Sequence, residues 1–475
     1  MNSYRKIAVS IIFISLAFSC DKGFKAVNID PNRIQEISPG SLLNEIIYNT
    51  TSNNASEYIN ITSRLMQVQI VYPEFYGGVQ RYEIHSSTGT PIWNANYKWA
   101  KNIAEMLKVS RQDSANNYVA VALTLKAWVY SNLTDCFGNI PFSDASKGDE
   151  GVFQPPYDNQ ETIYKQLVAD LEEANTLYNT TAGMLYGTDI LFNNNVGLWQ
   201  KFTNSLRLRL LLRMSGADPD AIQQMVEIIN HPDKYPVFDS FDAQAVLQVT
   251  GEDPNLSPWP RKLDLTSMRA AASFFVDVLN DFNDPRREKL LDQATKNGVQ
   301  IGYKGIPAGY DEPSFDYSPS DLNTDQVVAP MIIPILTYAE VELIKAELAQ
   351  KGYIPDAEQH YKLGVNAAIR LWTGADAPAG YFDNPKAAYD GTLERIITQK
   401  YVALYFTDYQ QWDEYRRLGL PKLPATASML NDGKVPSRLS YPSDQLIYNP
   451  KNYRDALSNM GGTDDINAKV WWDVQ

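Results

Sequence analysis

The stretch that decides the fold is GLWQKFTNSLRLRLLLRMS, Gly197 to Ser215. It has no proline and no internal glycine, and good helix formers dominate it, so it predicts a long α-helix. One apolar stripe recurs at helical spacing: Trp199, Phe202, Leu206 and Leu210. A second stripe follows on the later turns: Leu208, Leu211 and Leu212. A surface helix needs only one stripe, so two stripes predict a helix packed between neighbours.

Three arginines, Arg207, Arg209 and Arg213, lie late in this helix, where the helix dipole favours cations. Their long stems can pack on apolar surface while their guanidinium groups pair with carboxylates. We therefore predict a structural role for these arginines within a layered helical scaffold.

Helical periodicity elsewhere predicts paired helices. The expected helical pairs are 93–132, 160–215, 335–372 and 393–418. The last is expected to break near Thr407 and Asp408, and to end at Gly419. Asp356 is the expected N-cap of the helix that follows it. Shorter helices are expected at 41–48 and 63–71. Repeated helical hairpins suggest tetratricopeptide-like repeats, although the consensus is poor.

Two other regions lack helical periodicity. Residues 232–329 are rich in Gly, Pro, Asp, Asn and aromatic residues, and predict an irregular subdomain with helical period only near 265–280. Residues 72–90, YPEFYGGVQRYEIHSSTGT, contain paired glycines and four aromatic residues, and predict an aromatic loop. The chain after Pro421 is expected to be loop-like.

The first residues resemble a secretion signal. Arg5 and Lys6 precede a short apolar run, and the sequence LAFSC ends at Cys20. This is a loose lipobox, which predicts a lipoprotein signal peptide over 1–19, lipidation of Cys20 and a polar tether over 20–40. The alternative is an ordinary signal peptide followed by a chance cysteine. The only other cysteine is Cys136, so we expect no disulfide in an exported protein.

The chain is acidic, with a formal net charge of -14. Residues 1–19 carry two basic residues and no acidic one, so their removal lowers the charge to -16. Such a chain repels nucleic acid and anionic membranes, and both are excluded as electrostatic partners.

Catalytic and metal-binding patterns are missing from the sequence. The three histidines are far apart, and no HExxH, CxxC, GxSxG or phosphate loop occurs. Because 56 acidic residues produce carboxylate pairs by chance, no glycosidase pair can be named. We expect no catalytic residue, no metal site and no cofactor. A structural calcium ion remains an alternative, because Asp464 and Asp465 could hold a cation instead of forming a solvated turn.

Several stretches together are similar to the motifs of one protein family. The stretch at 199–215 is similar to the family's "WkkfaNSLrlRlalR" helix, and DCFGNIPFSDA at 135–145 to its "fGdiP" turn. Further matches are NDPRR at 283–287, ILTYAEVELIKAELAQKG at 335–352, QQWDEYRRLGLP at 410–421, VPSRLSYP at 435–442 and VWWD at 470–473. Together these stretches resemble the SusD/RagB nutrient-binding outer-membrane lipoproteins of Bacteroidetes, in their SusD-like, starch-binding-associated branch.

The resemblance implies a mainly α fold. Tetratricopeptide-like helical hairpins would form a right-handed superhelical scaffold with an irregular, loop-rich ligand-binding half, all within a single SusD-like domain over 41–475. It also implies a lipid-anchored protein on the outer face of the outer membrane that acts as a lid on a SusC-type TonB-dependent β-barrel transporter. Such proteins capture oligosaccharides, or sometimes peptides, for import and are not enzymes. The matching motifs are scaffold residues, so no ligand-binding residue transfers with them.

The ligand site must therefore be argued from chemistry. Aromatic rings in loops can cover the CH faces of a sugar, while polar side chains bind its hydroxyl edges. The candidate platform residues are Trp259, which ranks first because it lies between prolines, and Tyr72, Phe75, Tyr76, Tyr82, Tyr303, Tyr310, Phe315 and Tyr317. For each of them, a packing role within the core or a loop is the alternative. The tryptophans on helical faces are assigned to the core: Trp93, Trp128, Trp199, Trp372 and Trp412.

Three functions remain open at this point. The first is a surface protein that binds glycan, or peptide, for a transporter. The second is a surface glycoside hydrolase on a helical scaffold. The third is a helical-repeat adaptor that binds only protein.

Overall fold

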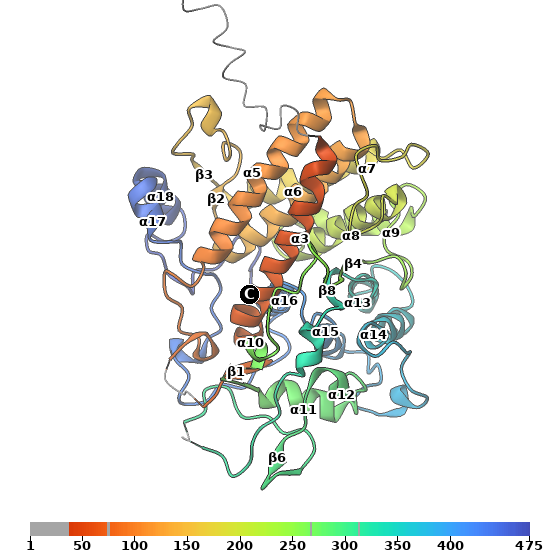
Figure 1. The fold of residues 1–475 in the computed structure, drawn as a ribbon, viewed down its shortest axis with the longest axis vertical. Helices are drawn as coiled ribbons and strands as arrows, with labels where there is room; N and C mark the ends of the chain where they lie inside the picture. Colours follow the sequence, from red (N-terminus) through yellow and green to blue (C-terminus); the bar gives the residue numbers. More distant parts are fainter. Residues whose placement is uncertain (1–37, 74–76, 267, 312–313) are drawn as a thin grey trace, which may run out of the picture. The chain divides into compact units, whose positions relative to one another are not determined.

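The structure is a computed structural model that describes residues 38–73, 77–266, 268–311 and 314–475. Residues 39–475 form one compact unit (Figure 1). The predicted signal peptide, Cys20 and most of the tether lie outside the described residues. Within the described part of the chain, no helix combines the length and the apolar character that crossing a membrane requires.

The fold is mainly α, as predicted. Its longer helices are α3 (Pro39–Glu57), α5 (Thr90–Gln112), α6 (Asn116–Phe137), α7 (Gln160–Leu177), α8 (Val196–Met214), α9 (Asp220–Asn230), α13 (Tyr338–Gln350), α14 (Ala357–Thr373), α15 (Leu393–Ala403) and α16 (Gln410–Leu418). Helices α5 and α6, α7 and α8, and α13 and α14 pack as pairs, at the places where the sequence predicts hairpins. The predicted break in the fourth pair is the short segment between α15 and α16.

Four details differ from the sequence prediction. Helix α3 continues through a π-helical turn and α4 (Ser63–Leu65), and strand β1 (Gln69–Val71) replaces the rest of the helix expected at 63–71. Strand β8 (Met331–Leu336) replaces the expected start of the helix at 335. Asp356 has a φ of 68° and its side chain makes no capping hydrogen bond. After Pro421 the chain forms two short helices, α17 (Asp444–Tyr448) and α18 (Pro450–Ser458).

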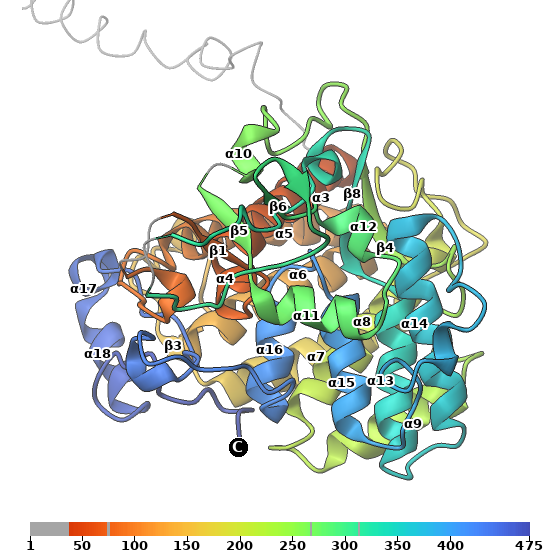
Figure 2. The ribbon, with the colours of Figure 1, turned by 90° about the horizontal axis from the view of Figure 1, so that it is seen from below.

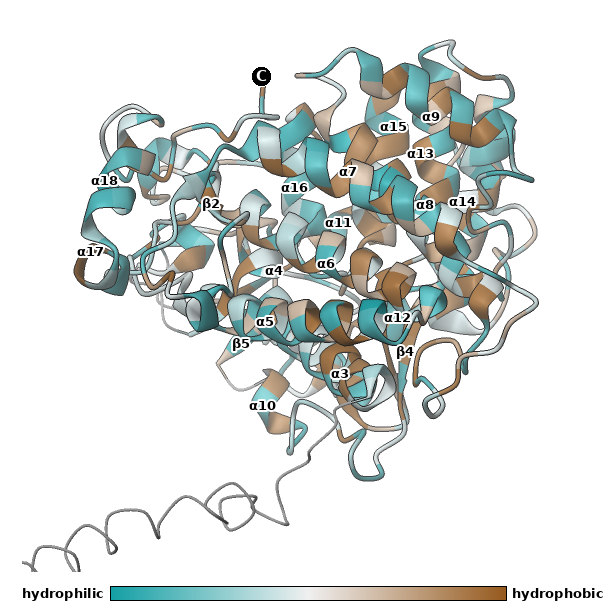
Figure 3. Cartoon of the chain, turned by 90° about the horizontal axis from the view of Figure 1, so that it is seen from above, coloured by the Kyte–Doolittle hydropathy of each residue, from teal (hydrophilic) through white to brown (hydrophobic). Residues whose placement is uncertain are grey.

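Helix α8 lies at the centre of the helical layers. Both predicted apolar stripes are buried, with side chains at most 1% exposed, and almost every other residue after its first turn is buried too. A helix closed off on all sides is what the double stripe predicts. Helix α5 differs, because it buries only one face, and its hydrophilic and hydrophobic residues alternate along it in Figure 3.

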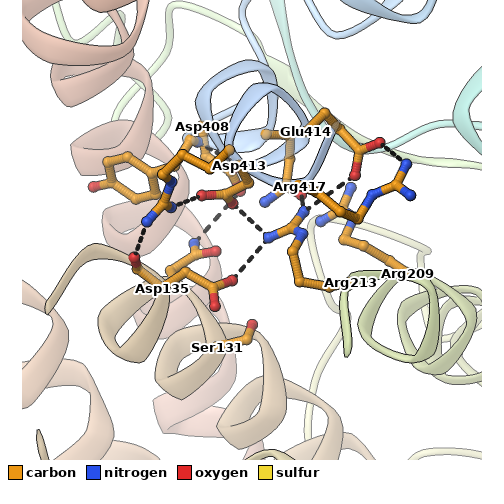
Figure 4. Close-up of polar contacts among 12 residues, drawn as sticks. Ser131, Asp135, Arg209, Arg213, Asp408, Asp413, Glu414 and Arg417 are labelled. Atoms are coloured by element: carbon orange, nitrogen blue, oxygen red, sulfur yellow. Dashed lines mark hydrogen bonds and ion pairs between the residues drawn. The ribbon is translucent and has the colours of Figure 1, made fainter. Parts of the chain in front are cut away.

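The three arginines of α8 pair with carboxylates, which confirms their predicted structural role. Arg213 donates to Asp135 on α6 at 2.9 Å and to Asp413 on α16 at 2.7 Å (Figure 4). Arg207 pairs with Glu172 on α7. The buried pairs of Arg213 connect α8 to α6 and α16, and the partly exposed pair of Arg207 and Glu172 connects it to α7. Removing one partner of a buried pair would leave an uncompensated charge, which is costly.

The segment between α9 and α13 is irregular. It contains β4 (Ala245–Val249), α10 (Leu263–Thr266), β5 (Arg269–Ala271), α11 (Ser273–Asp281), α12 (Arg287–Leu290), β6 (Thr295–Lys296) and β7 (Val299–Gln300). Strand β4 pairs antiparallel with β8, β6 with β7, and β5 with β1. Figure 2 shows β1 and β5 side by side at one edge of the helical layers. This ladder joins the aromatic loop after β1 to the irregular segment.

Candidate functional site: an aromatic cluster between two loops

Four of the predicted aromatic residues lie together, and we call Tyr72, Tyr310, Phe315 and Tyr317 the platform cluster. The Tyr72 ring centroid is 5.8 Å from that of Tyr310 and 6.1 Å from that of Phe315. Phe315 is 5.8 Å from Tyr310 and 5.7 Å from Tyr317. The rings meet edge to face or tilted, which are the favoured arrangements for aromatic pairs. Tyr72, Phe315 and Tyr317 are half-buried, so each keeps part of its ring in solvent.

Backbone pairing brings the two loops together. Tyr72 directly follows β1, and its N–H donates to the Met268 carbonyl, next to β5. The second loop is attached to β5 through a bridge between Ile306 and Ala272. A Cβ atom on Gly305 would lie 2.6 Å from the Ser273 nitrogen and 2.8 Å from the Ala271 oxygen, so only glycine allows this approach. The close contact sets the position of the residues that follow it.

Tyr310 anchors the cluster. Its side chain is 5% exposed, and its hydroxyl donates to the Val71 carbonyl at 3.1 Å. Buried Arg81 donates to the Tyr310 carbonyl, and its guanidinium lies 5.7 Å from the centroid of the Tyr310 ring. Arg81 also donates to the Ser428 carbonyl at 2.7 Å, which adds a third chain segment. The rings therefore rest on a support that several segments hold in place.

A lysine lies over the ring of Tyr317. Lys304 Nζ lies 3.8 Å from the centroid of the Tyr317 ring, and the Tyr317 hydroxyl donates to the Gly305 carbonyl at 2.9 Å. Sequence reasoning missed both Lys304 and Arg81. Lys304 is adjacent to Tyr303 in the sequence, but nothing in the sequence shows that it covers a ring thirteen residues further on.

An unusual carboxyl group follows the second loop. Burial, with a smaller contribution from Asp292, raises the pKa of Asp321 to about 7. Its Oδ1 accepts from the Leu322 N–H at 2.7 Å, while Arg269 in β5 acts in the opposite direction to burial. The charge of this segment is therefore sensitive to pH near neutrality.

Three of the other candidates, Tyr82, Tyr303 and Trp259, are not part of the platform cluster. Tyr82 is 1% exposed and accepts a hydrogen bond from Gln67, so its ring belongs to the core and is not a platform; burial raises its pKa to about 12. Tyr303 is half-buried under Arg287, 4.8 Å from its ring centroid. Half-buried Trp259 packs at 5.7 Å on Phe406, a buried core residue. Phe75 and Tyr76 lie outside the described residues.

Most of the tryptophans assigned to the core are there. Trp93, Trp128, Trp199 and Trp412 are at most 4% exposed. Trp372 is a correction, because it is only half-buried at the end of α14, where its ring lies 5.4 Å from Tyr405. The position of Trp372 on a helical face predicted burial, but this residue lies in the last turn of α14, which reaches the surface.

Among the described residues, no group of three or more His, Cys, Asp or Glu side chains could hold a metal ion. Asp464 is already engaged, because its carboxylate accepts from Arg438 at 2.5 Å and from the Tyr441 N–H at 3.0 Å.

Comparisons with known proteins agree with this architecture. The family model of SusD-like proteins, described as "Starch-binding associating with outer membrane", matches residues 31–442. A search of the curated proteins found no match.

Solved structures show the same fold. A chitin-binding protein is 27% identical, with a TM-score of 0.81, over 92% of this chain and 100% of its own. A SusD homologue from Bacteroides uniformis is 22% identical, with a TM-score of 0.79, over 93% and 100% of the two chains. A chitin-binding SusD homologue from Flavobacterium johnsoniae is 21% identical, with a TM-score of 0.77, over 91% and 98%. With the family model matched over most of its length, this chain belongs to the SusD-like family.

Proposed function

We propose that this protein is a cell-surface lipoprotein that binds oligosaccharide and delivers it to a SusC-type TonB-dependent outer-membrane transporter. The platform cluster is the observation that carries the proposal. It offers the partly exposed rings of Tyr72, Phe315 and Tyr317 on a support that three chain segments hold. Partly exposed aromatic rings suit the CH faces of sugar units.

The family and the N-terminal sequence support the proposed location. Acylation of Cys20 would attach the protein to a membrane, since each buried acyl CH₂ contributes about 0.8 kcal/mol and several chains act together. The transporter partner is carried over from the resemblance. The glycan class is supported by the family description and by the names of two similar structures, both called chitin-binding.

We propose that the protein binds its ligand without cleaving it. A retaining or inverting glycosidase needs two carboxyl groups facing a sugar subsite, about 5–10 Å apart. The cations Lys304 and Arg81 and backbone carbonyls contact the rings of the platform cluster. The carboxylate of Asp316, between Phe315 and Tyr317, is already paired with Lys296 at 2.6 Å. A peptide ligand is the second candidate, because tyrosine rings also bind apolar side chains.

The test has two parts. The purified protein is screened against soluble starch and chitin oligosaccharides, other oligosaccharides and a peptide panel, and the membrane-bound protein is isolated together with its partners. We expect saturable binding of an oligosaccharide and a co-isolated TonB-dependent barrel identified by mass spectrometry. Binding of a peptide but of no oligosaccharide would show that the ligand is a peptide. The absence of both a ligand and a barrel would overturn the proposal.

A further inference from the structure

An aromatic cavity away from the platform cluster lies between the segment after β2 (Ile140–Pro141) and helix α17. Its volume is about 220 Å³, and its lining includes Trp93, Tyr97, Phe153, Gln445 and Tyr448. We call it the α17 pocket. Figure 1 shows α17 and α18 beside β2 and β3 (Tyr157–Asp158), and apart from β1 and β6 near the platform cluster. None of its lining residues belongs to that cluster.

The floor of the α17 pocket is rigid. Trp93 is 4% exposed, and its ring centroid lies 4.9 Å from that of Tyr97 and 5.1 Å from that of Phe137. The Tyr97 hydroxyl donates to the Pro141 carbonyl at 2.8 Å. Both rings at the base are therefore fixed by packing and by a hydrogen bond before any ligand arrives.

The mouth of the pocket carries two exposed rings. Phe153 is 81% exposed and Tyr448 is 68% exposed. The backbone that carries them is tied together, because Gln154 donates to the Tyr448 carbonyl at 2.9 Å and Asn449 donates to the Pro155 carbonyl at 2.7 Å. Because these two exposed rings lie together at the mouth of a cavity, they form a patch of the kind that marks an interaction site.

One polar group gives the pocket its chemistry. Gln445 Oε1 accepts from the Tyr157 hydroxyl at 3.1 Å, which fixes the orientation of the amide. The Gln445 Nε2 group has no hydrogen-bond partner among the residues that the structure describes. Rings with a free amide donor suit a ligand that has both an apolar face and oxygen acceptors. The volume is below the roughly 300–1,000 Å³ of sites for drug-sized ligands, so it suits a single ring.

We infer that the α17 pocket binds one pyranose unit of an oligosaccharide, as a second site separate from the platform cluster. This inference rests on the proposed function for its ligand class. An apolar side chain from a protein partner would use the rings but would leave the Gln445 amide unpaired, so the pocket favours a sugar.

Fluorine NMR of the full chain labelled with fluorotryptophan tests the inference, because Trp93 forms part of the floor. Its resonance is assigned from the Trp93→Phe variant, and methyl pyranosides of glucose, galactose and mannose are the probes. We expect at least one methyl pyranoside to shift the Trp93 resonance saturably. Phe153→Ala, Tyr448→Ala and Gln445→Leu should each weaken this binding about fivefold or more. Ile447→Ala, at a 70% exposed neighbour on α17 outside the lining, should leave it unchanged.

Other outcomes overturn the inference. A Trp93 resonance that responds to N-acetyltyrosine amide but to no pyranoside would indicate a protein segment instead. Equal weakening by Ile447→Ala and Tyr448→Ala would show that the effect is not local to the pocket.

The Tyr72→Ala/Phe315→Ala variant separates this inference from the proposed function. A Trp93 response that persists there while oligosaccharide binding is lost supports two sites. A missing Trp93 response in a wild-type protein that binds oligosaccharide overturns the pocket alone. A wild-type protein that binds no saccharide at either site overturns both.

Discussion

Arg209 on α8 and Glu340 on α13 form a buried bidentate ion pair, in which Nε and Nη2 donate at 2.6 Å to the two carboxylate oxygens. The side chains are 3% and 2% exposed. Arg209 also donates to the Ile335 carbonyl in β8 at 2.8 Å. One side chain therefore joins the central helix to both a neighbouring helix and the strand that pairs with the irregular segment.

Replacing one member of this pair should be strongly destabilising. Glu340→Gln leaves the Arg209 charge buried without a carboxylate, so we expect a loss of about 3–5 kcal/mol in the free energy of unfolding. The control is Glu358→Gln, which removes an exposed pair with Lys362 and should cost at most about 0.5 kcal/mol. Denaturant unfolding measures both, and equal losses would contradict this account of the helical layers.

The stability of the protein should decrease as the pH rises, because of the raised pKa of Asp321. Its pKa is raised from 3.8 to about 7, first by burial, so the folded state binds this proton more tightly than the unfolded state. The stabilisation is complete below about pH 4 and is lost as the pH rises through about 7. Glu347 has a pKa lowered from 4.5 to about 2, because Arg417 outweighs burial. The stability that Glu347 contributes is therefore lost only as the pH falls from about 4.5 through about 2.

Asp321→Asn isolates this contribution. Unfolding curves at several pH values should show wild type losing stability relative to the variant between about pH 4 and pH 7. Parallel pH profiles of the two proteins would show that Asp321 titrates normally.

Gly305 should control the position of the platform cluster. In Gly305→Ala, the new Cβ meets the backbone of 271–273, which cannot move as a flexible side chain can. We expect a loss of about 1–3 kcal/mol in stability and weaker ligand binding. Gly183→Ala, whose added Cβ meets nothing within 4 Å, is the control. Unchanged affinity and stability in Gly305→Ala would show that the loop does not depend on this contact.

Cys20 should decide whether the protein is bound to the membrane. Cys20→Ser removes the acylated thiol, so we expect the protein to leave the membrane fraction and to lose incorporation of labelled fatty acid. Cys136→Ser replaces a buried thiol in α6 and should keep both properties. A Cys20→Ser protein that still carries lipid would contradict the proposed anchor.

The sequence predicts elements that carry their own local pattern. The expected helical pair 160–215 begins where α7 begins, at Gln160, and the arginines late in α8 pair with carboxylates as predicted. Strands β1 and β8 were missed because their pairing partners lie far along the chain. The platform cluster has the same difficulty, since Tyr310 binds the Val71 carbonyl across 239 residues. Composition identified the rings, but only tertiary structure shows which of them meet.

The α17 pocket shows a different limit. Its floor residue Trp93 has the apolar spacing of a core residue and is indeed buried, so its sequence context gives no indication of a ligand. The exposed rings at the mouth come from two segments whose backbones are joined by amide side chains. Such contacts leave no periodic pattern in the sequence.

The most direct measurement is calorimetric titration of the oligosaccharide that binds wild type, with chromatography of the recovered ligand. The account predicts an intact ligand and binding about tenfold or more weaker in Tyr72→Ala/Phe315→Ala, because two ring faces are removed. Tyr353→Ala removes a 48% exposed tyrosine from the loop after α13 and should bind as wild type does. Unchanged affinity in the double variant, or shortened oligosaccharide in the recovered ligand, would contradict the central claim.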